Sequence, residues 1–273
     1  MAEEKEEDSK KEMDKYVRGI IYGNLGIVCK LTTKATSNFV GREDEIEAVT
    51  ETLMKERMRN CILVGKAGVG KTEIVRKACQ NLKNGDVVLS LDVTALQAGC
   101  TYVGMIEKRT NNIVKSIVSW NDKHENKIIL FIDEIHVLAT VGKNDFSGSV
   151  AVSNTIKPYL SDGTLIIIGA TTLEEYDKYI KADKALMRRL PPIYVNEMEH
   201  SSIASVIYKF GKKRISKDLC EYIFEKSKEI SYLQNPDCSL EIADRTIARA
   251  KYHSRNEVEK EDIDISVKMM KRI

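Results

Sequence analysis

The stretch Gly65-Lys66-Ala67-Gly68-Val69-Gly70-Lys71-Thr72 fits the pattern G-x-x-x-x-G-K-[ST], which is typical of a loop that wraps the phosphates of a nucleoside triphosphate. It directly follows the apolar run Cys61–Val64, which predicts a short buried strand. It directly precedes Glu73–Ala78, which has the composition of a helix. A chance glycine-rich turn would lack these flanks, so the sequence predicts a nucleotide site.

The chemistry of this loop depends on its backbone and on its last two residues. Glycines let the chain curl until several N–H groups face one anion, and the helix that follows adds the positive end of its dipole. We expect Lys71 to reach the β- and γ-phosphates and Thr72 to ligate Mg²⁺. The expected phosphate-binding residues are Ala67, Gly68, Val69, Gly70, Lys71 and Thr72.

A second apolar run, Lys127–Ile132, ends in Asp133-Glu134 and forms a Walker B segment. A strand that is apolar on both faces is typical of the middle of a parallel sheet, and ligands bind at the carboxyl ends of such strands. We expect Asp133 to hold Mg²⁺ and Glu134 to polarise the attacking water as a general base. Acidic residues also cap helices, but the pairing with the phosphate loop favours the catalytic interpretation.

The composition limits the class of partner. The chain has 273 residues, which suggests one large domain or a main domain with a smaller companion, and 42% of them are hydrophobic, enough to bury a core. Its 43 basic and 41 acidic residues are interspersed and give a net charge of only +2. No basic field argues for nucleic acid. Proteins are therefore the expected partners.

The sequence also argues against a metalloprotein, a secreted protein and a membrane protein. The six cysteines include no C-x-x-C pair and indicate reduced thiols, and the four histidines lack metal-ligand spacing, so we expect no metal beyond Mg²⁺. Residues 1–15 are nearly all charged and predict a frayed helix or a disordered tail rather than a signal peptide. No apolar run approaches the ~20 residues that cross a bilayer. We expect a soluble, cytoplasmic protein.

The pattern along the chain alternates strands with helices and then becomes helical. Expected elements of the first part are a helix at 43–58, a strand at 86–91, helices at 105–118 and about 150–160, and strands at 164–169 and 193–195. Expected helices of the second part are 203–210, 219–230, 240–250 and 261–270. This order predicts an α/β fold, a parallel sheet with helices on both faces, followed by a small all-helical lid. The expected domains are a charged tail and lead-in at 1–38, an ATPase domain at 39–198 and a lid at 199–273.

Taken together, these residues resemble the first ATPase domain of the Clp-type AAA+ unfoldases, which include ClpA, ClpB and ClpC, over most of residues 39 to about 250. Val40-Gly41-Arg42-Glu43 is similar to the entry motif of that family, which implies that Val40 and Gly41 contact the adenine of ATP. Gly169–Tyr176 resembles its sensor-1 segment, which implies that Thr172 orients the lytic water.

The resemblance also implies assembly. Arg188 and Arg189 match the arginine fingers of the family, which act on the nucleotide of the neighbouring subunit, and a guanidinium suits charge that spreads over a γ-phosphate. Fingers that act in trans need a homo-oligomer, in this family usually a hexameric ring. The loop 98–104 takes the place of the pore loop, and Tyr102 would grip a threaded polypeptide.

Several positions depart from the family pattern. Thr101 and Val103 flank Tyr102 where basic residues are usual. The segment Asn235–Ile242 resembles a nucleotide-sensing part of the lid and implies a nucleotide contact at Ile242, but Cys238 stands where a lysine is usual. An adaptor domain, a coiled-coil insertion and a second ATPase domain are not found in this sequence, so partnership with a peptidase is not expected.

Three functions remain open at this point. The first is a Mg²⁺-dependent, ring-forming ATPase that remodels, unfolds or translocates a protein substrate with the help of an adaptor or without one. The second is a regulatory switch whose ATP state gates a partner without threading. The third is a DNA-associated AAA+ ATPase, against which the balanced charge argues.

Overall fold

The computed structural model describes residues 2–31, 40–82, 85–100, 103–140 and 153–271. The chain forms two compact units. The first unit comprises Met1–Thr33, Ile46–Val64 and Val75–Tyr194, and the second comprises Lys34–Glu45, Gly65–Ile74 and Val195–Ile273. The phosphate loop thus groups with the carboxy-terminal helices, and not with the strand that precedes it.

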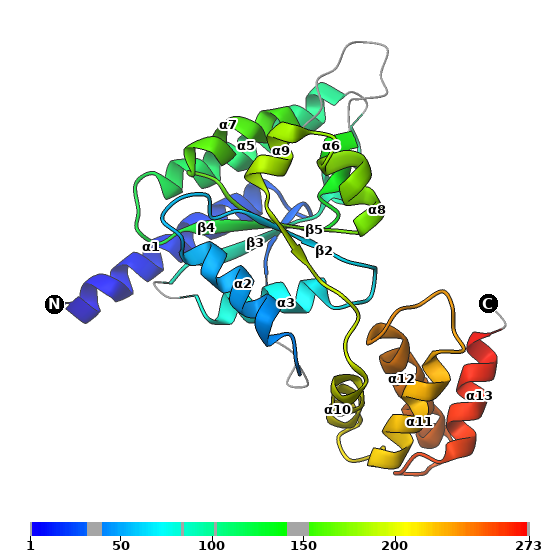
Figure 1. Ribbon diagram of the computed structural model, residues 1–273. Coiled ribbons are helices and arrows are strands. Elements are labelled where there is room, and N and C mark those ends of the chain that lie inside the picture. Colours follow the sequence, from blue (N-terminus) through cyan, green and yellow to red (C-terminus); the bar gives the residue numbers. More distant parts are fainter. Residues whose placement is uncertain (1, 32–39, 83–84, 101–102, 141–152, 272–273) are drawn as a thin grey trace. The chain divides into compact units, whose positions relative to one another are not determined.

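The first unit is built on a six-stranded sheet with the order β1-β3-β4-β5-β2-β6 (Figure 1). Its strands are β1 (Val28–Lys30), β2 (Cys61–Val64), β3 (Val87–Leu91), β4 (Ile128–Ile132), β5 (Ile166–Thr171) and β6 (Pro192–Tyr194). Five strands run parallel, as the α/β prediction requires, whereas the short edge strand β1 pairs antiparallel with β3. Val64 lies opposite Thr171, and Ile132 lies opposite Gly169, so the carboxyl ends of β2, β5 and β4 lie at one edge.

Helices cover both faces of this sheet, with α2 on one face and α5 and α7 on the other (Figure 1). The helices up to β6 are α1 (Ala2–Gly23), α2 (Glu43–Met54), α3 (Lys71–Gln80), α4 (Val93–Gln97), α5 (Val103–Asn121), α6 (His136–Thr140), α7 (Ser153–Asp162), α8 (Leu173–Glu175), the π-helix η1 (Tyr176–Ile180) and α9 (Lys184–Arg189). The sheet is therefore enclosed, which is the physical reason that its strands read as unbroken apolar runs.

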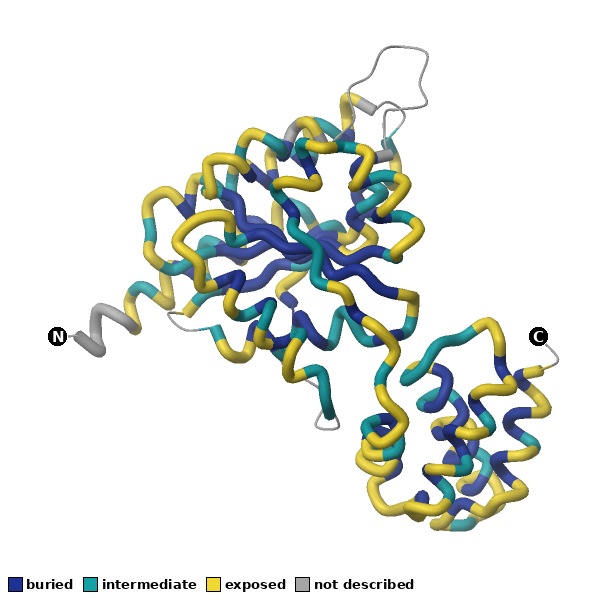
Figure 2. Tube along the Cα trace, viewed as in Figure 1, coloured by how far each residue is buried: buried dark blue, intermediate teal, exposed yellow. Residues whose placement is uncertain are grey.

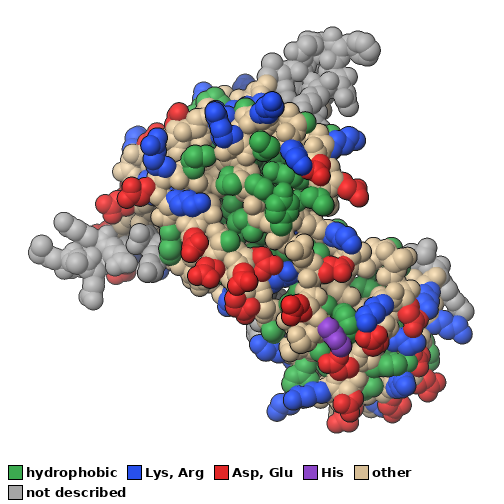
Figure 3. Space-filling model, in the orientation of Figure 1, with side chains coloured by type: hydrophobic (Ala, Val, Ile, Leu, Met, Phe, Trp, Pro, Cys, Tyr) green, Lys and Arg blue, Asp and Glu red, His purple; other side chains and the backbone are tan. Residues whose placement is uncertain are grey.

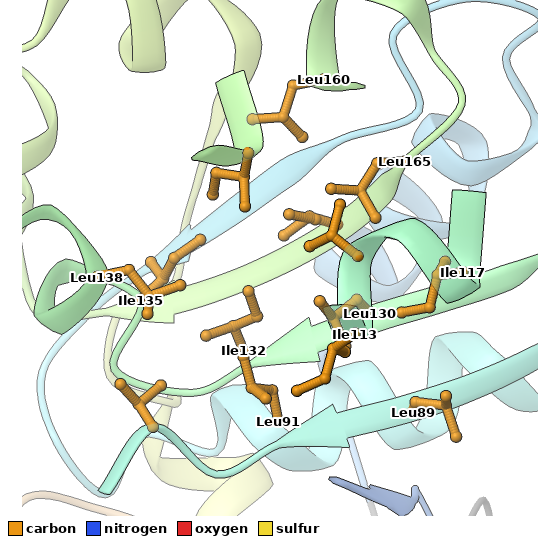
Figure 4. Close-up of a cluster of buried hydrophobic side chains, with 14 of the residues drawn as sticks. Leu89, Leu91, Ile113, Ile117, Leu130, Ile132, Ile135, Leu138, Leu160 and Leu165 are labelled. Atoms are coloured by element: carbon orange, nitrogen blue, oxygen red, sulfur yellow. The ribbon is translucent and has the colours of Figure 1, made fainter. Parts of the chain in front are cut away.

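The core of the first unit lies between the sheet and these helices. Every residue of β2, β4 and β5 is buried, and Figure 2 shows the strands as the buried centre. Figure 4 shows Leu130 and Ile132 of β4 facing Ile113 and Ile117 of α5. Burying one such side chain contributes about 1.5–3 kcal/mol. This packing holds the strand ends that carry the acidic residues.

The charged amino-terminal segment is helical, and its second half belongs to this core. The sequence favoured a frayed helix or a disordered tail for residues 1–15, whereas helix α1 runs on without a break to Gly23. Met13, Val17 and Ile20 are buried, at 1%, 2% and 6% exposure. Their spacing places them on one face of the helix. Because this apolar pattern begins among the charged residues of the segment, it is difficult to recognise in the sequence.

The second unit contains a bundle of four helices, α10 (His200–Gly211), α11 (Lys217–Ser227), α12 (Asp237–Tyr252) and α13 (Lys260–Met270). Apolar residues from all four helices form its core, including Ile207, Ile223, Ile242 and Ile263, each at 0% exposure. The all-helical character expected after residue 199 is what the structure has. Among the helices of the described ranges, none is both long and apolar enough to cross a membrane.

Candidate active site

The phosphate loop joins β2 to α3 and has the backbone that an anion cradle needs. Gly68 and Gly70 have φ angles of +79° and +97°, a region that side chains disfavour. A Cβ on Gly65 would overlap the Val195 carbonyl oxygen, so only glycine fits there. These conformations allow successive N–H groups to turn towards one anion.

The lysine of the loop lies inside it. The Nζ atom of Lys71 donates hydrogen bonds to the carbonyl oxygens of Gly65 and Lys66, at 2.8 and 2.9 Å. Helix α3 begins at Lys71, so its amino-terminal N–H groups follow the loop directly. A curled glycine backbone, a central ammonium and a helix amino terminus together fit the triphosphate of ATP.

The turn before α12 lies against the same loop within the second unit. The Nζ atom of Lys66 donates to the Gln234 side chain at 3.2 Å, and a Cβ on Gly68 would come within 2.9 Å of the Asp237 Cβ. The start of the segment expected to sense nucleotide therefore touches the loop. Ile242, further along that segment, has its side chain in the core of the bundle.

Arg42 also contacts the loop, and the sequence analysis gave it no role. Its guanidinium donates to the Val69 carbonyl oxygen at 3.1 Å and to Glu45 at 2.8 Å, and its side chain is 7% exposed. Arg42 follows Val40 and Gly41, the residues expected to contact adenine. It therefore ties the expected adenine-binding segment to the phosphate loop. The sequence signal that could have identified Arg42 is its position within the family's entry motif, directly after Gly41.

The acidic pair of the Walker B segment lies at the carboxyl edge of the sheet. Strand β4 ends at Ile132, and Asp133 and Glu134 are exposed. Glu134 has a φ angle of +52°, and its N–H donates to Asp133 at 3.1 Å. The Ile135 N–H then bonds to the Ala170 carbonyl oxygen at 3.1 Å. The turn thus presents two carboxylates at the edge where β2 leads into the phosphate loop.

Thr172 caps the short helix α8 at the end of β5. Its hydroxyl accepts a hydrogen bond from the Glu175 N–H at 3.3 Å, and the Glu175 carboxylate accepts one from the Thr172 N–H at 3.0 Å. These capping contacts hold the Thr172 side chain at the carboxyl end of β5, the edge of the sheet that also carries Asp133 and Glu134.

The two arginines at the end of α9 differ in their surroundings. Arg189 is anchored, because its Nε donates to the Ser161 hydroxyl at 2.5 Å and its Nη1 to the Ala185 carbonyl oxygen at 2.8 Å. Arg188 is exposed and has no hydrogen bond or ion pair with any residue that the structure describes. The geometry therefore separates one arginine held by its own fold from one that is available to another molecule.

Two further expectations concern the pore loop and metals. Tyr102 lies outside the described residues, so its expected grip on a polypeptide stays a prediction. The described ranges contain no group of three or more His, Cys, Asp or Glu side chains that could hold a metal ion. Thr72 and Asp133 remain the residues expected to hold Mg²⁺, and a hydroxyl and a carboxylate are oxygen ligands that this ion accepts.

Comparisons with known proteins show what the chain is similar to. The family described as "ATPase family associated with various cellular activities (AAA)" matches residues 61–196. The chaperone protein ClpB of Mycoplasmoides gallisepticum is 34% identical over 238 residues, 81% of this chain and 33% of that protein. The Saccharomyces cerevisiae Hsp104–ADP complex is 28% identical with a TM-score of 0.77, over 90% of this chain and 45% of that one.

A closed-state cryo-electron-microscopy reconstruction of Hsp104 with ATPγS and FITC-casein is similar to the same extent. Its TM-score is 0.76 at 28% identity, over 91% of this chain and 45% of the Hsp104 chain. The chain thus spans about a third of the ClpB relative and less than half of Hsp104. These likenesses therefore cover only part of larger proteins.

Proposed function

The chain belongs to the AAA ATPases, as a Clp-type member similar to the first ATPase domain of ClpB, and we propose that it forms a ring and uses ATP hydrolysis to remodel, unfold or translocate a protein substrate. The observation that carries this proposal is the ordered set of phosphate loop, Asp133-Glu134, Thr172 and Arg188. Each of these features occupies a strand end or a helix end of one sheet architecture, where α/β enzymes place their chemistry.

Each residue has a distinct proposed role in hydrolysis. Lys71 and the loop amides bind the phosphates, while Thr72 and Asp133 hold Mg²⁺. Bound ATP–Mg²⁺ supplies the phosphoryl group that is transferred to water. Glu134 accepts the proton of the attacking water, and its exposed position at the sheet edge leaves it accessible to that water. Thr172, whose side chain the capping contacts hold at the end of β5, orients that water.

A ring would complete the site with a guanidinium from the neighbouring subunit. Arg188 is the better finger, because Arg189 is held by Ser161 and Ala185 of its own subunit. Figure 3 shows hydrophobic side chains gathered on the face that carries α9 and β6. Exposed apolar residues of these elements and of α8 are Leu173, Met187 and Tyr194, at 49%, 37% and 53% exposure. Such a surface favours contact with another protein.

A protein substrate is the class that the charge and the relatives favour. The net charge of only +2 gives no basic field for nucleic acid, and casein accompanies Hsp104 in a similar structure. All six cysteines are free thiols, which supports a reducing, cytoplasmic setting. The regulatory switch remains the second candidate.

The test replaces Glu134 with glutamine. E134Q should bind ATP with unchanged affinity and lower kcat by about 10²–10⁴-fold, because only the general base is lost. Glu174→Gln is the matched control and should hydrolyse normally. Mass measured with E134Q plus ATP should show a ring, and a monomer at all protein concentrations would contradict the assembly. Tyr102→Ala separates motor from switch, since only a motor loses substrate processing while it keeps basal hydrolysis.

A further inference from the structure

The turn after β4 and the end of β5 are joined by a polar cluster outside the residues assigned above. His136, the first residue of α6, lies with its Nδ1 atom 3.1 Å from the Thr171 hydroxyl and 3.2 Å from the Glu175 carboxylate. Thr171 is 3% exposed, and the side chains of His136 and Glu175 are 13% and 33% exposed. The cluster is therefore largely shielded from water.

A single carboxylate oxygen collects the hydrogen bonds of this cluster. Glu175 Oε2 accepts from the Thr171 hydroxyl at 2.9 Å and from the Thr172 N–H at 3.0 Å. Since Thr171 gives its only proton to Glu175, its hydroxyl oxygen can only accept from His136, which places a proton on Nδ1. The His136 ring also stacks on Tyr179 of η1, with centroids 5.9 Å apart.

The charge of the carboxylate is favoured by these donors. Partial burial raises the pKa of Glu175, but the N–H of Thr172, the hydroxyls of Thr172 and Thr171 and the nearby His136 outweigh it, so the pKa lies below its ordinary value. An ionised carboxylate makes stronger hydrogen bonds than a neutral acceptor. The hydrogen bonds of the cluster therefore hold the turn after β4 strongly to the end of β5.

The contacts continue the pairing of β4 with β5 beyond the strands. The last paired residues are Ile132 and Gly169, after which the chain turns away at Asp133. Three links then follow in order: Ile135 N–H to the Ala170 carbonyl, His136 Nδ1 to the Thr171 hydroxyl, and Glu175 to the Thr172 N–H. One side of this ladder carries Glu134 and the other carries Thr172.

We infer that His136, Thr171 and Glu175 are positioning residues that fix the general base Glu134 and the sensor Thr172 at a constant separation. This inference rests on the roles proposed above for Glu134 and Thr172. The three residues touch neither the water nor the phosphates. They act by preventing the turn at Asp133-Glu134 from shifting relative to the end of β5, and a small misplacement of a reacting group lowers the rate of chemistry strongly.

The experiment measures kcat and KM for ATP hydrolysis by the full chain with leucine, asparagine or glutamine at position 136. His136→Leu should lower kcat at least tenfold, with KM within threefold of the wild type. His136→Asn keeps a polar atom close to the Nδ1 position and should recover most of kcat. His136→Gln carries its amide further out and should not. A ligand-binding role would change KM, and a merely apolar packing role would favour leucine over asparagine.

Two more variants keep the test decisive. Thr171→Val preserves shape and removes the hydroxyl, so it should reproduce the loss of kcat even if His136→Leu unfolds. His124→Leu is the matched control, because His124 lies between α5 and β4, where it stacks on Trp120 of α5 away from the cluster, and its kcat should stay normal. Combined with Thr172→Val, His136→Leu should add little further loss, since both act through the sensor.

The outcomes separate this inference from the proposed function. Normal kcat in folded His136→Leu and Thr171→Val, or fully additive losses with Thr172→Val, would overturn the positioning role. If E134Q is inactive while those variants are normal, only the positioning role fails. If E134Q itself hydrolyses ATP like the wild type, the assignment of the base fails instead.

Discussion

The ammonium of Lys157 in α7 lies 2.6 Å from the carboxylate of Asp183, the residue that caps the amino end of α9. The other oxygen of Asp183 accepts hydrogen bonds from the N–H groups of Ala185 and Leu186, at 3.1 and 3.2 Å. Both side chains of the ion pair are only 21% exposed. One carboxylate therefore fixes the start of the short helix that ends in the two arginines.

Asp183→Ala should loosen α9 and, through it, the proposed finger. Loss of the cap alone should lower the free energy of unfolding by about 1 kcal/mol, and turnover in the assembled state should fall as well. Urea unfolding at pH 7 and ATPase assays check both results. Asp177→Ala, which removes an exposed ion pair with Lys181, is the control and should leave both unchanged. Equal effects of the two substitutions would contradict the anchoring role.

Substitution of Arg188 should affect turnover, whereas substitution of Arg189 should affect stability. Arg188→Ala should lower turnover of the ring by about 10³-fold or more, the usual worth of an arginine finger, with the free energy of unfolding unchanged. Arg189→Ala should cost about 1 kcal/mol of stability, because it loses the hydrogen bond to Ser161.

Mixing tests whether the finger acts in trans. Subunits with Arg188→Ala keep their base, and E134Q subunits keep their finger, so mixed rings should regain activity that neither variant has alone. No recovery on mixing, with mixed assemblies present, would show that Arg188 serves its own subunit.

Arg42→Met should weaken nucleotide binding. The substitution keeps an apolar stem but removes the hydrogen bond to the Val69 carbonyl and leaves Glu45 without its partner. Loss of a buried charged hydrogen bond costs about 1–3 kcal/mol, which corresponds to a roughly 5- to 150-fold weaker Kd if the loop is ordered only in the bound state. Titration with a fluorescent ATP analogue measures this, and the exposed Arg57→Met is the control. An unchanged Kd would restrict Arg42 to a structural role.

The four-helix bundle should lose stability in acid through Asp262. Hydrogen bonds from Arg255 lower the pKa of Asp262 below its ordinary value of 3.8, against a smaller effect of burial that raises it. A carboxyl whose folded-state pKa is lowered stabilises the fold above the unfolded-state pKa, and this contribution is lost as the pH falls through the folded-state pKa. Asp262→Asn should therefore lower Tm at pH 7, and the difference from wild type should shrink as the pH falls below about 3.8 and vanish below the folded-state pKa. Thermal melts across pH check this, and a constant difference would contradict it.

The sequence predicts those parts of the molecule whose signal is local. The phosphate loop can be recognised from its own glycines and the segments that flank it. The position of Asp133 can be predicted from strand β4, because a buried parallel strand is apolar throughout and Asp133 directly follows its last residue. Strand β5 was expected at 164–169 and lies at Ile166–Thr171, because its last residues, Ala170 and Thr171, are weakly apolar although buried.

Features that depend on distant residues could not be read from the sequence. The antiparallel strand β1 has three residues, of which only Val28 is buried, too few for any alternation to show. The contact between His136 and Glu175 joins α6 to α8 at the carboxyl end of β5. Neither residue belongs to a local sequence pattern that would predict the contact. The anchoring of Arg189 by Ser161 is likewise a product of folding.

The position of β1 has a consequence for the solubility of the folded chain. β1 pairs with β3 through Val28 and Leu91, and the Leu31 N–H bonds to the Val88 carbonyl oxygen at 2.9 Å. The Tyr16 ring of α1 lies against Trp120, with ring centroids 4.8 Å apart. Without residues 2–31, the outer edge of β3 would expose unpaired N–H and C=O groups, and Trp120 would lose this cover. Such an edge is a template on which strands of other molecules add. The charged amino-terminal segment thus protects the ATPase sheet against aggregation.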